Sequence, residues 1–162
     1  CPSGDRLYSA AQNKQTFYLT NMQPQIQGHN GGVWGDLEKK VRDWAGRCDT
    51  LYIVKAATID KDKYICKQTD LNEMAQKESS YKPLHFNGIV PKFFYMALLA
   101  YDKKTNTYRA LGIWSPHYNN SKSEYITIQE LQNRTGIDFF CNLSDDIEQA
   151  VETTIDQAYW GY

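Results

Sequence analysis

The sequence has almost no excess charge of either sign. Its 18 lysines and arginines are balanced by 19 aspartates and glutamates, which gives a net charge of −1 and a pI of about 6.3. Proteins that bind nucleic acids through a broad electrostatic surface are usually basic. The charge balance gives no support for such a surface, so any surface that binds phosphate must be local.

Long hydrophobic runs are also absent. The longest uncharged apolar run is FFYMALLAY, from Phe93 to Tyr101. A run of this length is too short to span a bilayer, and its length and composition are typical of a buried strand. We therefore expect no association with a membrane.

Cysteine is sparse and its spacing is wide. The four cysteines are Cys1, Cys48, Cys66 and Cys141, and no C-x-x-C pair is present, which argues against a zinc site. Three full pairings are open. We predict at least one disulfide and take Cys48–Cys66 as the first choice, because it would tie the start of one predicted strand to the polar region after it. Disulfides persist in oxidising compartments, so we expect a secreted or periplasmic protein.

The sequence shows no internal repeat, no low-complexity tract and no clear linker. Hydrophobic residues make up 41% and aromatic residues 14% of the chain, which is typical of a globular protein. A length of 162 residues fits one domain with a sizeable core. We therefore predict a single domain over residues 1–162.

Periodicity and turn residues predict a mixture of strands and helices, and hence an α+β fold. Trp34, Leu37, Val41 and Trp44 recur at the helical spacing and predict a helix from about Asn30 to Ala45. Strands are predicted over Thr16–Thr20, Leu51–Thr58, Val90–Tyr101 and Thr107–Trp114, the last two as an antiparallel pair.

Two further helices are predicted near the end of the chain. Thr127 is the predicted cap of the first, with Glu130 three residues later and Gly136 as its stop. Ser144 begins the second. The polar region Ile59–Asn87, which contains a proline, is predicted to be a long surface excursion.

The most informative run is LTNMQPQIQGHNGGVWGDLEKKVR, from Leu19 to Arg42. It places Asn21 and Asn30 around a Pro-Gln pair and a glycine-rich turn, and the predicted helix that follows carries Glu38 and Arg42. This order of groups suits one hard metal ion held against a phosphodiester.

Each of these residues also has an ordinary structural interpretation. The amide oxygen of Asn30 is a suitable ligand for Mg²⁺, but asparagine is equally common as a helix N-cap. Asn21 suits either a site or a turn at the end of a strand.

Glu38 and Arg42 are four residues apart and share one face of the predicted helix. They could serve a metal and a phosphate, or form a surface salt bridge worth less than about 1 kcal/mol. Arg6 could contact phosphate or be a solvated charge.

Taken together, the run closely resembles the second half of the active-site motif of the DNA/RNA non-specific endonucleases. This is a ββα-metal (His-Me finger) family that includes the endonuclease G group. The match includes the family's Asn-x-x-Pro-Gln at Asn21, Pro24 and Gln25, and the order Asn30, Glu38, Arg42. A weaker resemblance covers LYIVKAAT, the strand after Pro91 and the tail ITIQELQNRTGIDFF.

The resemblance implies an α+β, ββα-metal nuclease fold with an antiparallel sheet and packed helices, of which this chain would be the C-terminal two-thirds. It implies that Asn30 is the single protein ligand of one Mg²⁺ or Mn²⁺ and that Glu38 orients metal-bound water. Arg42 and Arg6 would lie near the phosphate, and Asn21 would position the groups around it. The implied activity is metal-dependent hydrolysis of DNA and RNA without preference for the sugar.

The family's general base is the histidine of an Asp-Arg-Gly-His motif, which in the family order lies just before the segment that begins here at Cys1. We therefore expect this chain to be an N-terminally incomplete, poor nuclease that requires the upstream segment, or a homodimer partner, to cover a strand edge beside Thr16–Thr20. The alternative is a non-catalytic module that binds nucleic acid or a protein on a nuclease scaffold.

None of the three histidines lies in the motif of the general base. His29 adjoins Asn30 and is the tempting substitute, but adjacent side chains usually diverge. His85 and His117 are interpreted as surface or hydrogen-bonded residues.

Overall fold

Four antiparallel strands form one open sheet at the centre of the molecule. The computed structural model describes residues 3–76 and 88–162. The strands are β1 (Thr50–Ala57), β2 (Phe93–Asp102), β3 (Thr107–Pro116) and β4 (Glu124–Ile126), and they lie side by side in that order. The hairpin predicted from residues 90–114 is confirmed, with Leu98 opposite Leu111 and Tyr101 opposite Tyr108.

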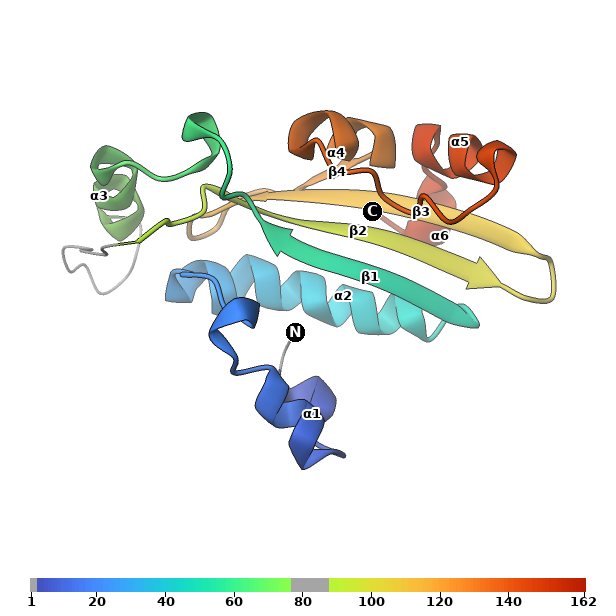
Figure 1. Ribbon diagram of the computed structural model, residues 1–162, viewed down its shortest axis with the longest axis horizontal. Coiled ribbons are helices and arrows are strands. Elements are labelled where there is room, and N and C mark those ends of the chain that lie inside the picture. Colours follow the sequence, from blue (N-terminus) through green and yellow to red (C-terminus); the bar gives the residue numbers. More distant parts are fainter. Residues whose placement is uncertain (1–2, 77–87) are drawn as a thin grey trace.

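Helices cover both faces of this sheet, so the fold has three layers (Figure 1). One face carries α2 (Gly35–Ala45), and the other carries α4 (Ile128–Thr135) and α5 (Asp145–Thr153). The short α6 (Gln157–Trp160) joins the α2 side, where the indole N–H of Trp44 donates to the carbonyl of Trp160 at 2.8 Å. The α+β prediction is therefore confirmed.

The two covering layers explain why β2 is apolar at almost every position. Its even-numbered side chains, such as Met96 and Leu98, pack with Trp34, Leu37 and Val41 on the α2 side. Its odd-numbered side chains, from Tyr95 to Leu99, pack with Ile128, Leu131 and Val151. A strand buried on both faces loses the alternation of polar and apolar residues that marks a half-exposed strand.

The helix of the informative run begins with an irregular turn. A π-helical segment, η3 (His29–Trp34), precedes α2, and Gly32 inside it leaves helical geometry at φ −100° and ψ −109°. The apolar stripe of Trp34, Leu37, Val41 and Trp44 is buried against the sheet, as the spacing predicts. The predicted helix is thus confirmed, but its first turn is π-helical and not α-helical.

The close approach of β4 to β3 depends on Gly112. A Cβ atom at this position would lie 2.9 Å from the carbonyl oxygen of Ile126 and 3.1 Å from that of Thr127. No side chain fits there without a shift of the backbone. The strand β4, which the sequence did not predict, leads directly into α4.

The caps of α4 agree with the sequence prediction. The hydroxyl of Thr127 accepts the backbone N–H of Glu130 at 3.1 Å, and Gly136 ends the helix in the left-handed conformation at φ 73°. Ser144 precedes α5, as predicted, without a side-chain capping bond. No helix of residues 3–76 and 88–162 is long and apolar enough to cross a membrane.

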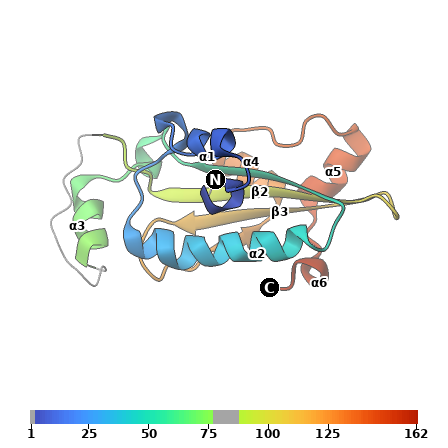
Figure 2. The ribbon, with the colours of Figure 1, turned by 90° about the horizontal axis from the view of Figure 1, so that it is seen from below.

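The strand predicted over Thr16–Thr20 is wrong. The described residues begin with η1 (Ser3–Arg6) and α1 (Ala10–Gln15), and the predicted strand runs from the end of α1 into η2 (Leu19–Asn21). The side chains of Phe17, Tyr18 and Leu19 are exposed. Aromatic and β-branched residues favour strands only where a neighbouring strand pairs with them. Here the segment pairs with none, and it lies on the β1 side of the molecule (Figure 2).

The excursion after β1 contains more structure than its polarity suggests. It begins with η4 (Asp62–Tyr64) and the helix α3 (Gln68–Gln76), which lies at one end of the sheet (Figure 1). Leu71, Met74 and Ala75 of this helix are buried. The remainder of the excursion, with His85, lies outside the described residues.

The predicted Cys48–Cys66 disulfide does not form. Both thiols are free, as is that of Cys141, and Cys1 lies outside the described residues. The thiol of Cys48 lies 3.6 Å from the carbonyl oxygen of Trp44, whereas that of Cys66 lies 3.5 Å from the sulfur of Met74. The strand β1 separates the two cysteines, and its eight residues span roughly 25 Å.

Candidate functional site

The solvent-facing side of η3 and α2 carries three of the residues singled out from the sequence. The side chains of Asn30 and Arg42 are exposed and that of Glu38 is half-buried, while the apolar stripe between them packs on the sheet. Asn30 is not the N-cap of the helix. Gly28 has that place, and the backbone N–H of Asn30 donates to the carbonyl of Ile26 at 2.9 Å. The side chain of Asn30 is therefore presented to solvent from the first helical turn.

Glu38 pairs with a lysine from the sheet and not with Arg42. The Nζ atom of Lys55 lies 3.0 Å from Oε1 of Glu38, and the two side chains are only 19% and 17% exposed. Lys55 belongs to β1, so this pair ties the helix to the edge of the sheet. A salt bridge at this depth orients the carboxylate more firmly than a solvated pair would.

Arg42 has its own partner in the N-terminal segment. Its Nε lies 2.9 Å from Oδ1 of Asp5, and both side chains are partly exposed. Arg6, next in the chain, donates from Nη1 to the backbone carbonyl of Asp5 at 3.3 Å. The guanidinium groups of Arg6 and Arg42 thus both contact Asp5, Arg42 at the carboxylate and Arg6 at the backbone carbonyl.

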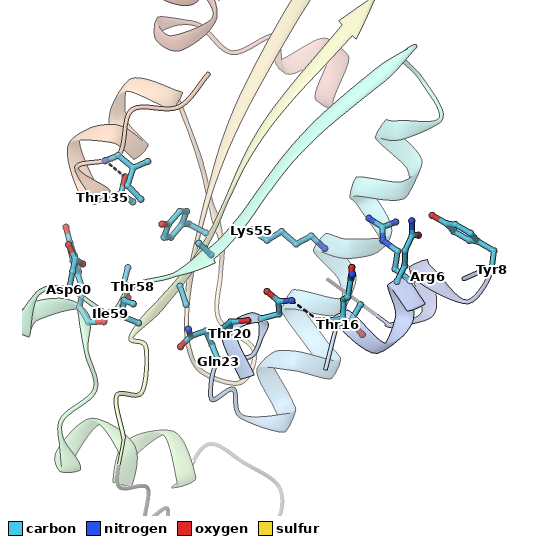
Figure 3. Close-up of a pocket in the computed structure, with 18 residues that line it drawn as sticks. Arg6, Tyr8, Thr16, Thr20, Gln23, Lys55, Thr58, Ile59, Asp60 and Thr135 are labelled. Carbon is cyan, nitrogen blue, oxygen red and sulfur yellow. Dashed lines mark hydrogen bonds between the residues drawn. The ribbon is translucent and has the colours of Figure 1, made fainter. Parts of the chain in front are cut away.

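A cavity of about 890 Å³ lies between this N-terminal segment and the edge of β1 (Figure 3). Arg6, Asn21 and Lys55 all line it, together with the amide side chains of Gln12, Gln15 and Gln23. Figure 3 shows Arg6 and Lys55 near one end and Asp60 and Thr135 near the other. The lining mixes polar and apolar groups, and the Nζ atom of Lys55 lies 3.0 Å from the Glu38 carboxylate.

Asn21 is held at the wall of this cavity by the N-terminal segment itself. Its side-chain N–H donates to the carbonyl of Gln15 at 2.7 Å. It ends a short helical turn and not a strand.

The structure brings some of the predicted residues together, but neither Asn30 nor Arg42 is among the residues that line the cavity. Arg6 and Asn21 share the cavity, and Glu38 reaches it through Lys55. Asn30 lies eight residues before Glu38, roughly two helical turns away.

Both described histidines are buried, so neither faces the cavity. The side chain of His29 is fully buried, and burial lowers its pKa to about 3, with a further lowering by His117. Burial also lowers the pKa of His117 to about 4, although its hydrogen bond to Pro91 opposes the shift. The interpretation of His117 as a hydrogen-bonded residue is confirmed, and a surface position is excluded.

One group of carboxylates among the described residues is close enough to hold a metal ion. Ligand oxygens of Asp138, Glu148 and Glu152 lie within 4.8 Å of one another. Burial, together with neighbouring Glu148, raises the pKa of Glu152. This group is on and next to α5, across the sheet from α2 (Figure 1), so it is distinct from the site predicted around Asn30.

Two partners of the predicted residues were missed in the sequence. Lys55 is the only charged residue in the predicted strand LYIVKAAT, and an isolated charge in an apolar strand is a signal that it has a partner. Asp5 has no comparable signal, because its pairing with Arg42 spans 37 residues of chain. Only the fold brings these two together.

Comparison with known proteins agrees with the motif. The family model described as DNA/RNA non-specific endonuclease matches residues 1–146. A nuclease of Nostoc sp. is 28% identical over 96% of this chain and 54% of its own length. The mitochondrial nuclease EXOG of Xenopus laevis is 26% identical over 90% of the chain and 40% of its own length.

A nuclease of Serratia marcescens is 24% identical over 84% of the chain and 47% of its own length. The chain therefore spans about half the length of these curated relatives. The family match covers nearly the whole chain, the fold has the expected α+β architecture, and the motif residues occupy one helix and the adjoining cavity. This chain belongs to the DNA/RNA non-specific endonuclease family.

Proposed function

We propose that this chain provides the metal-binding and phosphate-binding part of a sugar-nonspecific endonuclease that hydrolyses DNA and RNA. The observation that carries the proposal is the arrangement on η3 and α2. An exposed asparagine precedes a half-buried carboxylate and an exposed arginine on one solvent-facing side, beside a cavity with Arg6 and Lys55. Contacts with the phosphodiester backbone carry little sequence information, so such a site would cut with weak sequence preference.

The residues present fit one hydrated Mg²⁺ or Mn²⁺ ion. Asn30 offers an exposed amide oxygen, and Mg²⁺ usually keeps several waters and takes few protein ligands. When bound, the ion would stabilise negative charge on the leaving oxygen. The acidic group around Glu152 offers more carboxylates, but it lies across the sheet from α2, which carries Arg42.

The protein side chains would divide the remaining work. Lys55 holds the Glu38 carboxylate in one orientation at 3.0 Å, where it can accept hydrogen bonds from ordered water. Arg42 and Arg6 supply guanidinium donors, which match the geometry of phosphate oxygens. Asp5 holds the Arg42 guanidinium at 2.9 Å until a phosphate competes for it.

The position of the metal is tested by replacing Asn30 with alanine. We expect Asn30→Ala to abolish the Mg²⁺-dependent part of plasmid cleavage, because the variant lacks the single protein ligand of the proposed metal site. Asn133→Ala is the matched control, since Asn133 is an exposed asparagine on α4, on the other side of the sheet. Cleavage by Asn30→Ala at the wild-type rate would refute the assignment. The assay is made with the upstream Asp-Arg-Gly-His segment present.

A second candidate is a non-catalytic module that binds nucleic acid or a protein. It is favoured by one observation: both histidines that the structure describes are buried, so no described histidine can serve as a base at the cavity. A module of this kind would bind plasmid DNA without nicking it, under all metal conditions and with the upstream segment supplied.

A further inference from the structure

Two buried histidines contact each other in the core next to Asn30: His29, which precedes it in the chain, and His117, which follows β3. His29 and His117 face each other with ring centroids 5.2 Å apart. Phe94 packs against both rings, at 5.3 and 5.0 Å. Both side chains are almost completely excluded from solvent, at 0% and 2% exposure. Buried imidazoles must form hydrogen bonds within the protein, and these two do so with the same short stretch of chain.

His117 anchors the backbone just before the Asn30 turn. The backbone N–H of Ile26 donates to Nε2 of His117 at 2.9 Å, and Nδ1 donates to the carbonyl of Pro91 at 2.7 Å. Only one neutral tautomer satisfies both bonds, because a backbone N–H cannot accept and a carbonyl cannot donate. The backbone N–H of His117 also donates to the carbonyl of Lys92 at 3.0 Å. Ile26 is thereby fixed to the end of the sheet.

His29 forms a second set of hydrogen bonds, which links the turn before Asn30 to strand β3. The side-chain N–H of Gln25 donates to Nδ1 of His29 at 2.7 Å, which leaves Nε2 as the donor to the hydroxyl of Ser115 at 3.0 Å. The hydroxyl of Ser123 donates to the same Ser115 oxygen at 3.0 Å. Ser115 is a fully buried residue of β3.

Both sets of hydrogen bonds hold the chain immediately before Asn30. Gln25, Ile26 and His29 are all bonded to this buried network, and Asn30 follows at once. The backbone N–H of Asn30 donates to the carbonyl of Ile26, the same residue that His117 holds. The ring of His29 points into the core while the side chain of Asn30 is exposed.

Packing alone does not require histidines here. Burying two imidazoles costs desolvation that apolar side chains of similar size would avoid. Imidazoles add direction, because each hydrogen bond fixes the ring relative to its partner. The partners of His117 are backbone groups, and those of His29 are the side chains of Gln25 and Ser115. A single metal ligand needs positioning to about 0.5 Å, which a supporting layer of locked residues provides.

We propose that His29 and His117 are positioning residues that set the place and direction of the Asn30 side chain. The proposal rests on the proposed function of Asn30 as the metal ligand. It assigns no chemical step to either imidazole. The buried Ser115 hydroxyl completes the network from the sheet side.

Two buried serines provide a matched test that needs no metal. The Ser115 hydroxyl belongs to the network, whereas the Ser121 hydroxyl is buried and has no hydrogen-bond partner in the described structure. We expect Ser115→Ala to speed hydrogen exchange of the Asn30 and Gly31 amides by about tenfold relative to amides of β2. Ser121→Ala should leave them within about twofold of wild type. Equal effects of the two variants would overturn the proposal.

A second arm uses Mn²⁺ as the probe and NMR line broadening of the Asn30 side-chain amide as the readout. We expect His117→Leu to reduce the broadening at Asn30 by about tenfold, and His117→Gln, which can still accept and donate, to restore most of it. A folded His117→Leu variant with normal broadening and normal exchange would refute positioning. If His117→Leu does not fold, His117→Gln and Ser115→Ala decide.

The two arms separate this proposal from the proposed function. If the wild-type chain shows no Mn²⁺ broadening at Asn30, then Asn30 is not the metal ligand and the function is wrong. Hydrogen exchange in the serine pair still decides whether the histidine network holds the Asn30 turn.

Discussion

At the scale of single residues, the pair of Glu38 and Lys55 changes what a substitution at Glu38 should do. The helical spacing suggested that Glu38 would meet Arg42 at the surface, in which case its removal would cost little stability. In the structure both Glu38 and Lys55 are more than four-fifths buried and bonded to each other. Removing one partner therefore leaves a poorly solvated charge.

We predict that Glu38→Gln lowers the free energy of unfolding by about 1–2 kcal/mol, between the values for exposed pairs and buried charged hydrogen bonds. Lys55→Met should do the same, and the double variant should cost less than the sum of the two, because the pair is shared. Urea denaturation of the wild type, the two single variants and the double variant measures the coupling free energy between Glu38 and Lys55. Independent, additive losses would show that the pair contributes nothing specific.

His117 makes stability depend on pH in a direction that can be worked out. Its pKa is lowered from 6.5 to about 4, so the folded state binds fewer protons than the unfolded state between these values. The stability that neutral His117 provides is complete above pH 6.5 and is lost as the pH falls toward its folded pKa. The slope for one proton is about 1.4 kcal/mol per pH unit.

We predict that acidification from about pH 7 to about pH 5 destabilises the wild-type chain more than His117→Gln, which has no group to protonate at this position. Urea unfolding at the two pH values measures the difference. An identical loss in both proteins would mean that His117 is not neutral in the fold or that other groups account for the change.

At the scale of secondary-structure elements, β1 is the exposed edge of the sheet. The backbone N–H of Thr58 donates to the carbonyl of Phe93, and the register continues without interruption to Thr50 opposite Tyr101. Because antiparallel hydrogen bonds alternate along a strand, the backbone groups of Ile53, Lys55 and Ala57 face away from β2. Tyr52, Ile53 and Val54 are also among the exposed hydrophobic residues.

An apolar edge of this kind is a template for another strand. Thr16–Thr20 is not a strand, so the strand edge that a covering segment or a second copy would pair with is β1. We predict that the chain self-associates as its concentration rises and that Ile53→Lys suppresses this association. Sedimentation velocity measures it.

The matched control is Ile89→Lys, because Ile89 is similarly exposed but lies outside the sheet. The Ile89→Lys variant should self-associate to the same extent as the wild-type chain. A wild-type chain that is monomeric at all concentrations, or equal behaviour of the two lysine variants, would count against the edge of β1 as the contact.

At the scale of the whole molecule, the two faces of the sheet carry different chemistry. The α2 side holds the motif residues of η3 and α2, and the α5 side holds the acidic group of Asp138, Glu148 and Glu152. The cavity lies at the edge of β1 and is lined from both sides, by Arg6 and Lys55 and by Thr135 of α4. The charges around the motif residues are mixed, because Lys55 pairs with Glu38 and Arg42 pairs with Asp5. The proposed hydrolysis needs a base to deprotonate water, and both described histidines are buried.

We predict that the purified 162-residue chain nicks plasmid DNA very slowly with Mg²⁺, because positioned acid–base catalysis contributes about 10²–10⁴-fold. Adding an upstream segment with the Asp-Arg-Gly-His motif should restore nicking, and EDTA should remove it again. Rapid, EDTA-sensitive nicking by the chain alone would show that another residue serves as the base.

Much of the architecture could be predicted because it depends on residues close together in sequence. The caps of α4 require Thr127, Glu130 and Gly136 within ten residues, and the α2 stripe requires only helical spacing. The β2–β3 hairpin likewise follows from two apolar runs around a short turn. The family was also predicted from one continuous run, and the roles of Asn21, Asn30, Glu38 and Arg42 in that run stay a prediction.

Long-range pairing was decided only by the tertiary structure. The aromatic segment at Phe17 has the composition of a strand, but no strand lies beside it, so it became a turn. The partners of Glu38 and Arg42 are 17 and 37 residues away, and His29 meets Ser115 across 86 residues. The cysteines stayed apart because β1 lies between them. Local sequence determines which groups this chain can present, and the packing of the sheet determines which of them meet.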